Sequence, residues 1–310
     1  MYRKIIAFFT IFIMLISLSA CGNKDYSEVS TKTKDNNNSK GDKIEVVVSF
    51  NPLKEFAEAI GKDKITVTSI VSGGIEPHEF EPKAKDLENI NNGRIFVYNG
   101  LGMEPWAEKV LKTIDNKNVI IVEASKGGNF IKASKGEEGT HGEYDPHIWL
   151  SLKEAKVEAN NIKEALIKAD AANKEFYENN YKDFTSKLDS LFNEYDKKFK
   201  EVKNRDFVTG HEAFAYICRD FNLQQNSVEN MFSEGEPSAK KLKELVDYAR
   251  KNNVKVIFSE GNVSPKVSEA LASEIGAKVE SIYTLETKED NKDYLQSMRD
   301  NLEEIYVSLK

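Results

Sequence analysis

Residues 44–71 read IEVVVSFNPLKEFAEAIGKDKITVTSIV, and their pattern indicates the fold class. Residues 44–50 form a β-branched run typical of a strand, and residues 65–71 form another. Between them, residues 53–60 have the apolar spacing of an amphipathic helix. Strand, helix and strand in close succession predict a parallel βαβ unit.

The same alternation continues along the chain in two blocks. In the first block we expect helices over residues 83–90 and 104–113 and strands over 95–98 and 119–123. In the second block we expect strands ending at 207–208 and over 254–259 and 278–283, with helices over 211–220, 237–252, 265–275 and 292–308. Pro237 would occupy the first position of its helix. The two blocks predict an α/β fold of two lobes, each with a parallel sheet.

A long segment without Gly or Pro, residues 151–203, separates the two blocks. Its apolar side chains recur every three or four residues, at Tyr177, Tyr181, Phe184, Leu188, Leu191, Tyr195 and Phe199. This spacing predicts one face of a helix over 173–202, while residues 170–173 leave an interruption open. Such a helix would be ~45 Å long, enough to link both lobes rigidly. A coiled-coil dimer through the same face is the alternative.

The N-terminal residues are typical of an export signal. Two basic residues precede an apolar run over 5–18, which is shorter than the ~20 residues that span a bilayer. Residues 18–21 read LSAC and resemble a bacterial lipobox. We therefore predict a signal peptide over 1–20, cleaved before a lipidated Cys21. The alternative is a cysteine that follows an ordinary signal peptide by chance.

The domain organisation follows from these segments. Residues 21–43 contain almost no apolar side chains, so they are expected to form a flexible tether. We expect an N-terminal lobe over 44–150, a linking helix over 151–204 and a C-terminal lobe over 205–310. With a lipid on Cys21, the protein would lie outside the cytoplasm, anchored to the outer face of the bacterial cell membrane.

Charge and histidine content narrow the function classes. The chain has 44 Lys and Arg against 51 Asp and Glu, for a net charge of −7, and the two signs are interspersed. Because no basic stripe is present to neutralise phosphates, a nucleic-acid partner is not expected. The chain has only 4 His, so a histidine-based metal site would need most of them.

Three of these histidines lie where an α/β fold binds ligands. His78 and His211 closely follow predicted strands, and His147 precedes the long helix. Glu286 follows the strand predicted over 278–283. Ligands bind outside the carboxyl ends of the strands in open α/β sheets, so a site shared between the lobes is expected. For each residue a plain alternative stays open: a structural hydrogen bond for the histidines, and a solvated acidic turn for Glu286. His141 lies among Gly and Glu and is expected to be solvated.

Several motifs resemble those of one known family. They read EPH at 76–78, NGLGMEPW at 99–106, DPHIWL at 145–150, HEAFAY at 211–216 and EPS at 236–238, together with the strand and helix over 254–279. The chain resembles the metal-binding solute-binding lipoproteins of ABC transporters, which capture zinc or manganese outside the membrane. The resemblance covers residue 44 to the C-terminus.

The resemblance implies two lobes joined by a rigid helix, with one metal ion in the cleft between them. It implies that His78, His147 and His211 are the first three ligands, and that Glu286 matches the acidic fourth position of some zinc-binding members. An ABC permease would then be the partner, and we expect a monomer without enzymatic activity. Many zinc members carry a long His-rich loop before the second ligand, whereas residues 133–144 here contain a single His.

The expected ligand set favours Zn²⁺ as the transported ion. Three imidazoles and one carboxylate suit tetrahedral zinc, whereas Mn²⁺ prefers more oxygen ligands and a higher coordination number. In manganese-binding relatives the third position is typically a carboxylate, and here it is His211. A manganese receptor and a metal-dependent adhesin remain the alternatives. A zinc hydrolase with Glu79 or Glu212 as base is disfavoured, because it needs an open coordination position.

Overall fold

The computed structural model describes residues 43–71, 73, 75–133, 142–231, 237–261, 265–288 and 290–310. Residues 41–310 form one compact unit. The predicted signal peptide, Cys21, the tether up to residue 42 and the loop around His141 lie outside the described residues. Among the residues that are described, no helix is both long enough and apolar enough to cross a membrane.

The first lobe is built on a parallel four-stranded sheet with the order β2-β1-β3-β4. Its strands are β1 (Ile44–Val48), β2 (Ile65–Ser69), β3 (Ile95–Tyr98) and β4 (Ile120–Glu123). Its helices are α1 (Asn51–Gly61), α2 (Ala84–Asn92) and α3 (Ala107–Leu111), with a 3₁₀ turn at Lys62–Lys64. The apolar strands β1 and β3 occupy the centre of the sheet, where both faces are covered, as expected for parallel βαβ units.

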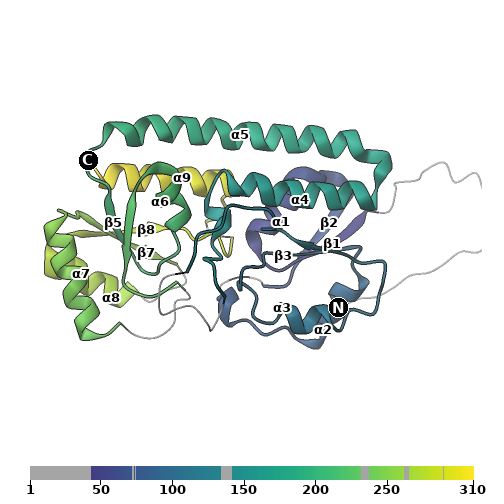
Figure 1. The fold of residues 1–310 in the computed structure, drawn as a ribbon, viewed down its shortest axis with the longest axis horizontal. Coiled ribbons are helices and arrows are strands. Elements are labelled where there is room, and N and C mark those ends of the chain that lie inside the picture. The colour runs from purple at the N-terminus through teal and green to yellow at the C-terminus, as the bar shows by residue number, and fades with distance from the viewer. Residues whose placement is uncertain are drawn as a thin grey trace, which may run out of the picture. The chain divides into compact units, whose positions relative to one another are not determined.

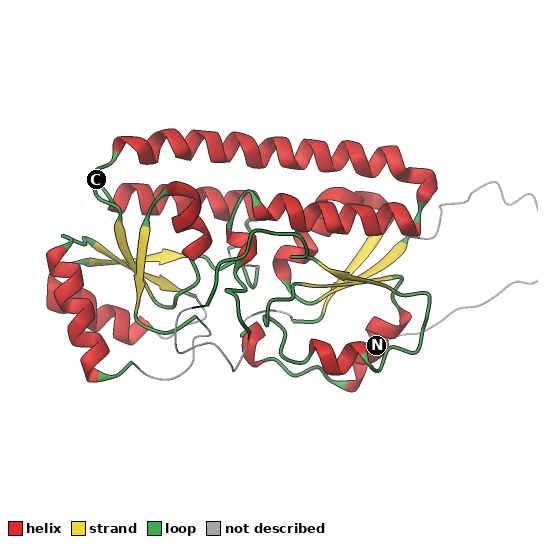
Figure 2. Ribbon diagram, in the orientation of Figure 1, coloured by secondary structure: helices red, strands yellow, loops and turns green. Residues whose placement is uncertain are grey.

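The second lobe repeats this arrangement with the order β6-β5-β7-β8, again all parallel. Its strands are β5 (Asp206–Thr209), β6 (Gln224–Ser227), β7 (Val256–Glu260) and β8 (Lys278–Ile282). Its helices are α6 (Ala215–Phe221), α7 (Ala239–Lys251), α8 (Pro265–Ile275) and α9 (Tyr294–Ser308). Figure 2 shows the two sheets as separate yellow groups, each accompanied by helices. The predicted two-lobed α/β class is confirmed.

Two consecutive helices, not one, fill the segment between the sheets. Helix α4 (Glu154–Ala169) is followed by a 3₁₀ turn at Ala171–Asn173 and by the 28-residue α5 (Lys174–Glu201). The break lies at Asp170, whose φ of −146° and ψ of 75° are not helical. The interruption that the sequence left open is therefore present. In Figure 1, α5 runs past both lobes, with α4 and α9 beside it.

The apolar face of α5 is buried within the chain itself. Tyr177, Phe184, Leu188, Leu191, Tyr195 and Phe199 are all less than one-tenth exposed and belong to the main hydrophobic core. The face packs against α1, α4 and α9. Because these contacts already cover the apolar stripe, the alternative of a coiled-coil dimer through this face is wrong.

Three local expectations need correction. Helix α6 begins at Ala215 and not at His211, so His211 lies in the loop after β5. Helix α7 begins after Ser238, whose hydroxyl accepts a hydrogen bond of 3.2 Å from the Lys241 N–H, so Pro237 precedes the helix cap. Strand β6 was not expected, because its sequence, QQNS, is polar and it becomes a strand by pairing with β5 at the edge of the sheet.

Candidate metal centre

The four predicted ligands converge between the two lobes, although the sequence separates them widely. His78 lies in a 3₁₀ turn, Pro77–Glu79, after β2, and His147 immediately precedes another, Ile148–Leu150. His211 follows β5 and Glu286 follows β8, so three of the four lie beyond the carboxyl ends of parallel strands. All four side chains are buried, with residue exposures of 5%, 0%, 2% and 1% in chain order.

His147 is the common neighbour of the other three side chains. Its Nε2 lies 3.4 Å from the Nε2 of His78 and 3.4 Å from the Nε2 of His211. The same atom lies 3.7 Å from Oε1 of Glu286. Donor atoms at ~2.0–2.1 Å from a tetrahedral zinc ion would lie about 3.4 Å from one another. The three distances therefore have the size expected for donor atoms around one small cation.

Potential donor atoms of His78, His147 and Glu286 lie within 4.8 Å of one another. His211 joins this cluster through its contact with His147. The structure thus groups His78, His147 and Glu286, and His211 adjoins this group through His147, so that two of the four predicted residues come from each lobe.

Asp145 fixes the orientation of the His147 ring. Its Oδ1 accepts a hydrogen bond of 2.9 Å from the His147 backbone N–H and lies 2.8 Å from Nδ1 of the ring. Both side chains are fully buried. A carboxylate on one ring nitrogen places the proton there and leaves the other nitrogen as a metal ligand. Nε2 of His147 therefore has its lone pair directed at the cluster.

His211 lies in an environment that keeps its imidazole neutral. Burial lowers its pKa well below the usual value, and the nearby His147 lowers the pKa further. Its backbone N–H donates to Oε1 of Glu260 at 3.3 Å. Burial raises the pKa of Glu260 to about 8, although the hydrogen bonds that its carboxyl group accepts from backbone N–H groups lower this pKa. A neutral imidazole is the form that binds a metal ion.

Gly210 allows Glu260 to approach the His211 backbone so closely. A Cβ atom at position 210 would lie only 1.9 Å from Oε2 of Glu260. Any larger residue would have to displace the carboxyl group. Gly210, Glu260 and Asp145 were not among the residues predicted for the site. For Asp145, its place two residues before His147 in the DPH motif was the available signal.

The loop that carries Glu286 is held by residues of the first lobe. The indole N–H of Trp149 donates to the Thr284 carbonyl at 2.8 Å, and the Asn51 backbone N–H donates to the Glu286 carbonyl at 3.4 Å. Within the loop, the Thr284 hydroxyl donates to Oε2 of Glu286 at 3.1 Å. Leu285 has a φ of +64°, so the loop turns in a left-handed conformation just before Glu286. These contacts direct the carboxyl group toward His147.

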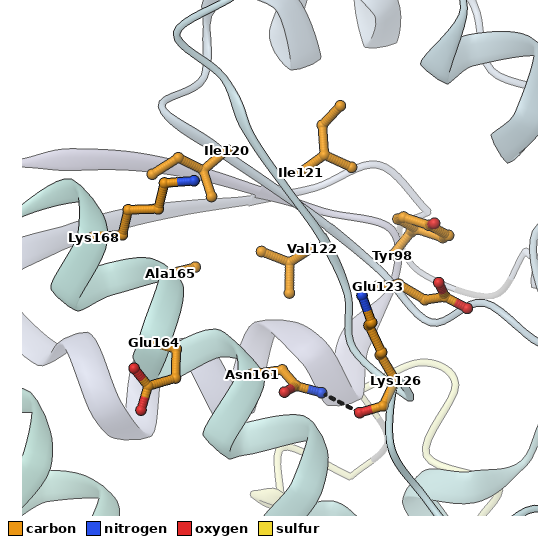
Figure 3. Close-up of a pocket in the computed structure, with 10 residues that line it drawn as sticks. All are labelled: Tyr98, Ile120, Ile121, Val122, Glu123, Lys126, Asn161, Glu164, Ala165 and Lys168. Atoms are coloured by element: carbon orange, nitrogen blue, oxygen red, sulfur yellow. Dashed lines mark hydrogen bonds between the residues drawn. The ribbon is translucent and has the colours of Figure 1, made fainter.

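A pocket with a volume of about 380 Å³ lies elsewhere, between β4 and α4. Figure 3 shows its lining, where Asn161 on α4 donates a hydrogen bond of 2.8 Å to the Lys126 carbonyl. The exposed Ile121 and the charged Glu164 and Lys168 also line it. None of the four predicted ligands is among its lining residues, so this pocket is not the metal centre.

Comparison with known proteins identifies the family. A family model described as "Zinc-uptake complex component A periplasmic" matches residues 46–307. A Treponema pallidum (strain Nichols) protein whose name proposes metal binding is 45% identical over 274 residues, covering 86% of this chain and 87% of its own length. The high-affinity zinc uptake system protein ZnuA of Bacillus subtilis (strain 168) is 38% identical over 323 residues, covering 100% and 99%.

One solved structure is also similar to this chain in both sequence and fold. The laminin-binding protein Lmb of Streptococcus agalactiae, described as having adhesin and metal-transporting activity, is 37% identical with a TM-score of 0.80. The match covers 87% of this chain and 100% of that chain. The fold, the converging histidines and these matches agree, and the chain belongs to the ZnuA family of periplasmic zinc-uptake components.

Proposed function

We propose that this protein is an extracytoplasmic receptor that binds Zn²⁺ and delivers it to an ABC import permease. One observation carries the proposal: three imidazole nitrogens and a carboxylate converge in a buried cluster at distances suited to a small tetrahedral cation. The Bacillus subtilis relative named for high-affinity zinc uptake supports the same ion.

His78, His147, His211 and Glu286 are the proposed ligands. Three neutral nitrogens and one oxygen favour zinc over manganese, which prefers oxygen ligands in a larger shell. Four protein ligands fill a tetrahedral shell and leave no position for a reactive water, so the protein is proposed to transport the ion without catalysing a reaction. The ion is the cargo of the protein.

The membrane anchor, the tether and the monomeric state also belong to the proposal. Lipidation of Cys21 would hold the protein on the outer face of the cell membrane, with residues 21–43 as tether and the unit from 44 onward as a monomeric receptor. The domain division into 44–150, 151–204 and 205–310 is proposed on the same basis. Adhesion is a second candidate function, favoured by the similarity to a laminin-binding protein.

Equilibrium binding to the purified protein tests the proposal. Zinc and manganese compete at equal concentration, and the bound metal is then measured by elemental analysis. We expect one zinc ion per chain in the wild type and none in the His78→Ala/His147→Ala/His211→Ala variant. The His141→Ala variant, which changes the remaining histidine, should bind as the wild type does. Preference for manganese, or stoichiometric zinc in the triple variant, would overturn the assignment.

A further inference from the structure

The motif NGLGMEPW at 99–106 contains a buried carboxyl group that is not part of the metal cluster. Glu104 is only 6% exposed. Its Oε1 accepts hydrogen bonds from the Ser49 hydroxyl at 2.5 Å and from the Asn99 backbone N–H at 2.7 Å. Its Oε2 accepts a third, from the Gly100 backbone N–H at 3.1 Å. Burial raises the pKa of Glu104 to about 7, and these three donors act against that effect because they favour the ionised form.

Glu104 thereby fixes the loop that follows β3. Gly100, Leu101 and Gly102 have φ values of +87°, +59° and +85°, and Leu101 adopts this left-handed conformation although it is not glycine. Two consecutive backbone N–H groups that bind one carboxylate form an anion-binding concavity of the kind known from nests. The carboxylate of Glu104 therefore supports a backbone conformation that the chain would otherwise seldom adopt.

The loop in turn contacts the segment that carries His147. The side chain of Asn99 is fully buried, and its Nδ2 donates to the Pro146 carbonyl at 3.0 Å. A second hydrogen bond of 3.0 Å joins the same nitrogen to the Gly100 carbonyl. Pro146 directly precedes His147, so the chain of contacts runs from Glu104 through Asn99 to the residue at the centre of the proposed ligand set.

Glu158 on α4 offers a contrast to Glu104. It is fully buried, and neither of its carboxyl oxygens has a hydrogen-bond partner among the described residues. Burial raises its pKa well above the usual value, and the negative charge of Glu104 raises the pKa further. The two carboxyl groups thus share one part of the interior, but only Glu104 binds the loop. This difference provides a matched control.

We propose that Glu104 and Asn99 are positioning residues that hold the Pro146 carbonyl, and with it the His147 imidazole, in the zinc-binding geometry; this inference rests on the proposed function. Neither side chain touches the ion. Both act by restricting where the central ligand can lie before the metal binds. Outer residues that orient metal ligands typically change affinity about 10- to 100-fold when they are replaced.

The experiment compares Glu104→Gln, Asn99→Ala and the double variant with Glu158→Gln. Zinc affinity is measured by chelator competition on the purified full chain, and thermal unfolding without metal monitors the fold. Glu104→Gln keeps the side-chain shape but turns an NH₂ group toward a backbone N–H donor. We expect zinc affinity to fall about 10- to 100-fold in Glu104→Gln and Asn99→Ala. Glu158→Gln, which also replaces a buried carboxyl by an amide, should bind zinc as the wild type does.

Two further readouts separate positioning from loss of stability. The double variant should bind no more weakly than the weaker single variant, because both changes interrupt one chain of contacts. Cobalt bound in place of zinc should show an altered visible absorption spectrum in Glu104→Gln and an unchanged one in Glu158→Gln. A change of global stability alone would not alter the spectrum of the bound metal.

Wild-type affinity and spectrum in a folded Glu104→Gln variant would overturn the inference, as would an equal loss in Glu158→Gln. If Glu104→Gln does not fold, Asn99→Ala decides, and wild-type binding by that variant overturns the inference. Failure of the proposed function is distinguishable, because the wild-type protein itself would then fail to bind zinc. Binding by the wild type with unaffected variants rejects the positioning role alone.

Discussion

The indole N–H of Trp149 donates a hydrogen bond of 2.8 Å to the carbonyl of Thr284, 135 residues further along the chain. Trp149 follows His147 by two residues and Thr284 precedes Glu286 by two. This bond therefore ties two proposed ligands, one from each lobe, to a common support. The Tyr294 hydroxyl donates to the Trp149 carbonyl at 2.6 Å and strengthens the same connection.

Replacing Trp149 by Phe should weaken zinc binding without removing it. The Phe ring retains most of the packing against Phe50, whose ring centroid is 4.7 Å from that of Trp149. The lost hydrogen bond, worth about 1 kcal/mol, corresponds to about a fivefold loss of affinity if it acts on the Glu286 loop. Chelator competition measures the change. The same variant in a Glu286→Gln background should show a smaller effect, and an equal effect there would contradict the coupling.

The change Asp145→Asn tests the orientation of His147. An asparagine amide preserves the shape but no longer provides a carboxylate for the ring nitrogen. We expect about a 10- to 100-fold loss of zinc affinity, because a partner of this kind fixes the tautomer of a ligating histidine. Asp170→Asn is the control, since Asp170 accepts from Tyr177 at 2.9 Å at the break between α4 and α5. Calorimetric titration with zinc that shows equal losses in both variants would argue against this role.

The change Gly210→Ala should disturb the opposite side of the cluster. Its methyl group would collide with Oε2 of Glu260, which would have to leave the His211 backbone. A crowded buried site of this kind costs about 1–3 kcal/mol of unfolding free energy. Urea denaturation measures that loss, and zinc affinity should fall with it. A variant as stable as the wild type would show that the carboxyl group moves without cost.

Glu158→Gln should stabilise the protein at high pH. The folded-state pKa of Glu158 lies above its value in the unfolded chain, so the folded state retains a proton that the unfolded state has lost. The contribution of Glu158 to the stability of the wild type therefore decreases as the pH rises above about 4.5. We expect Glu158→Gln to gain stability relative to the wild type as the pH rises from about 4.5 toward 8, because the amide does not titrate.

Denaturation of the metal-free protein across this pH range checks the prediction. The slope of stability against pH should be smaller in Glu158→Gln than in the wild type. Parallel curves for the two proteins would mean that Glu158 has the same proton affinity folded and unfolded.

The strands and helices with clear apolar periodicity could be predicted from sequence, because their burial imposes the pattern. Pro265–Ile275 and Ile95–Tyr98 have the predicted bounds. Strand β6 could not be predicted, since its four polar residues acquire strand geometry only from the neighbouring β5. The start of α6 was misplaced because the apolar residues after His211 continue into the helix without a visible cap.

The candidate site shows the same division. His78, His147 and His211 could be predicted from the sequence because each lies in a distinctive short motif near a strand end or a helix start. The residues that hold the Glu286 loop could not be predicted, because Asn51 and Trp149 contact this loop from positions far away in the sequence. Glu260 ends a strand and has no local signal that connects it with His211. Long-range packing, which a single sequence does not encode locally, decides these contacts.

Helix α5 resists separation of the two lobes because it packs along both of them. Its buried aromatic and leucine side chains contact α1 and α4 at one end and α9 toward the other, so the lobes cannot swing apart without bending 28 residues of helix or unpacking them. Small displacements of the ligand loops are mechanically much easier than a wide hinge motion. Under the proposed function, release of the ion would therefore depend on movement of the ligand loops and not on wide separation of the lobes.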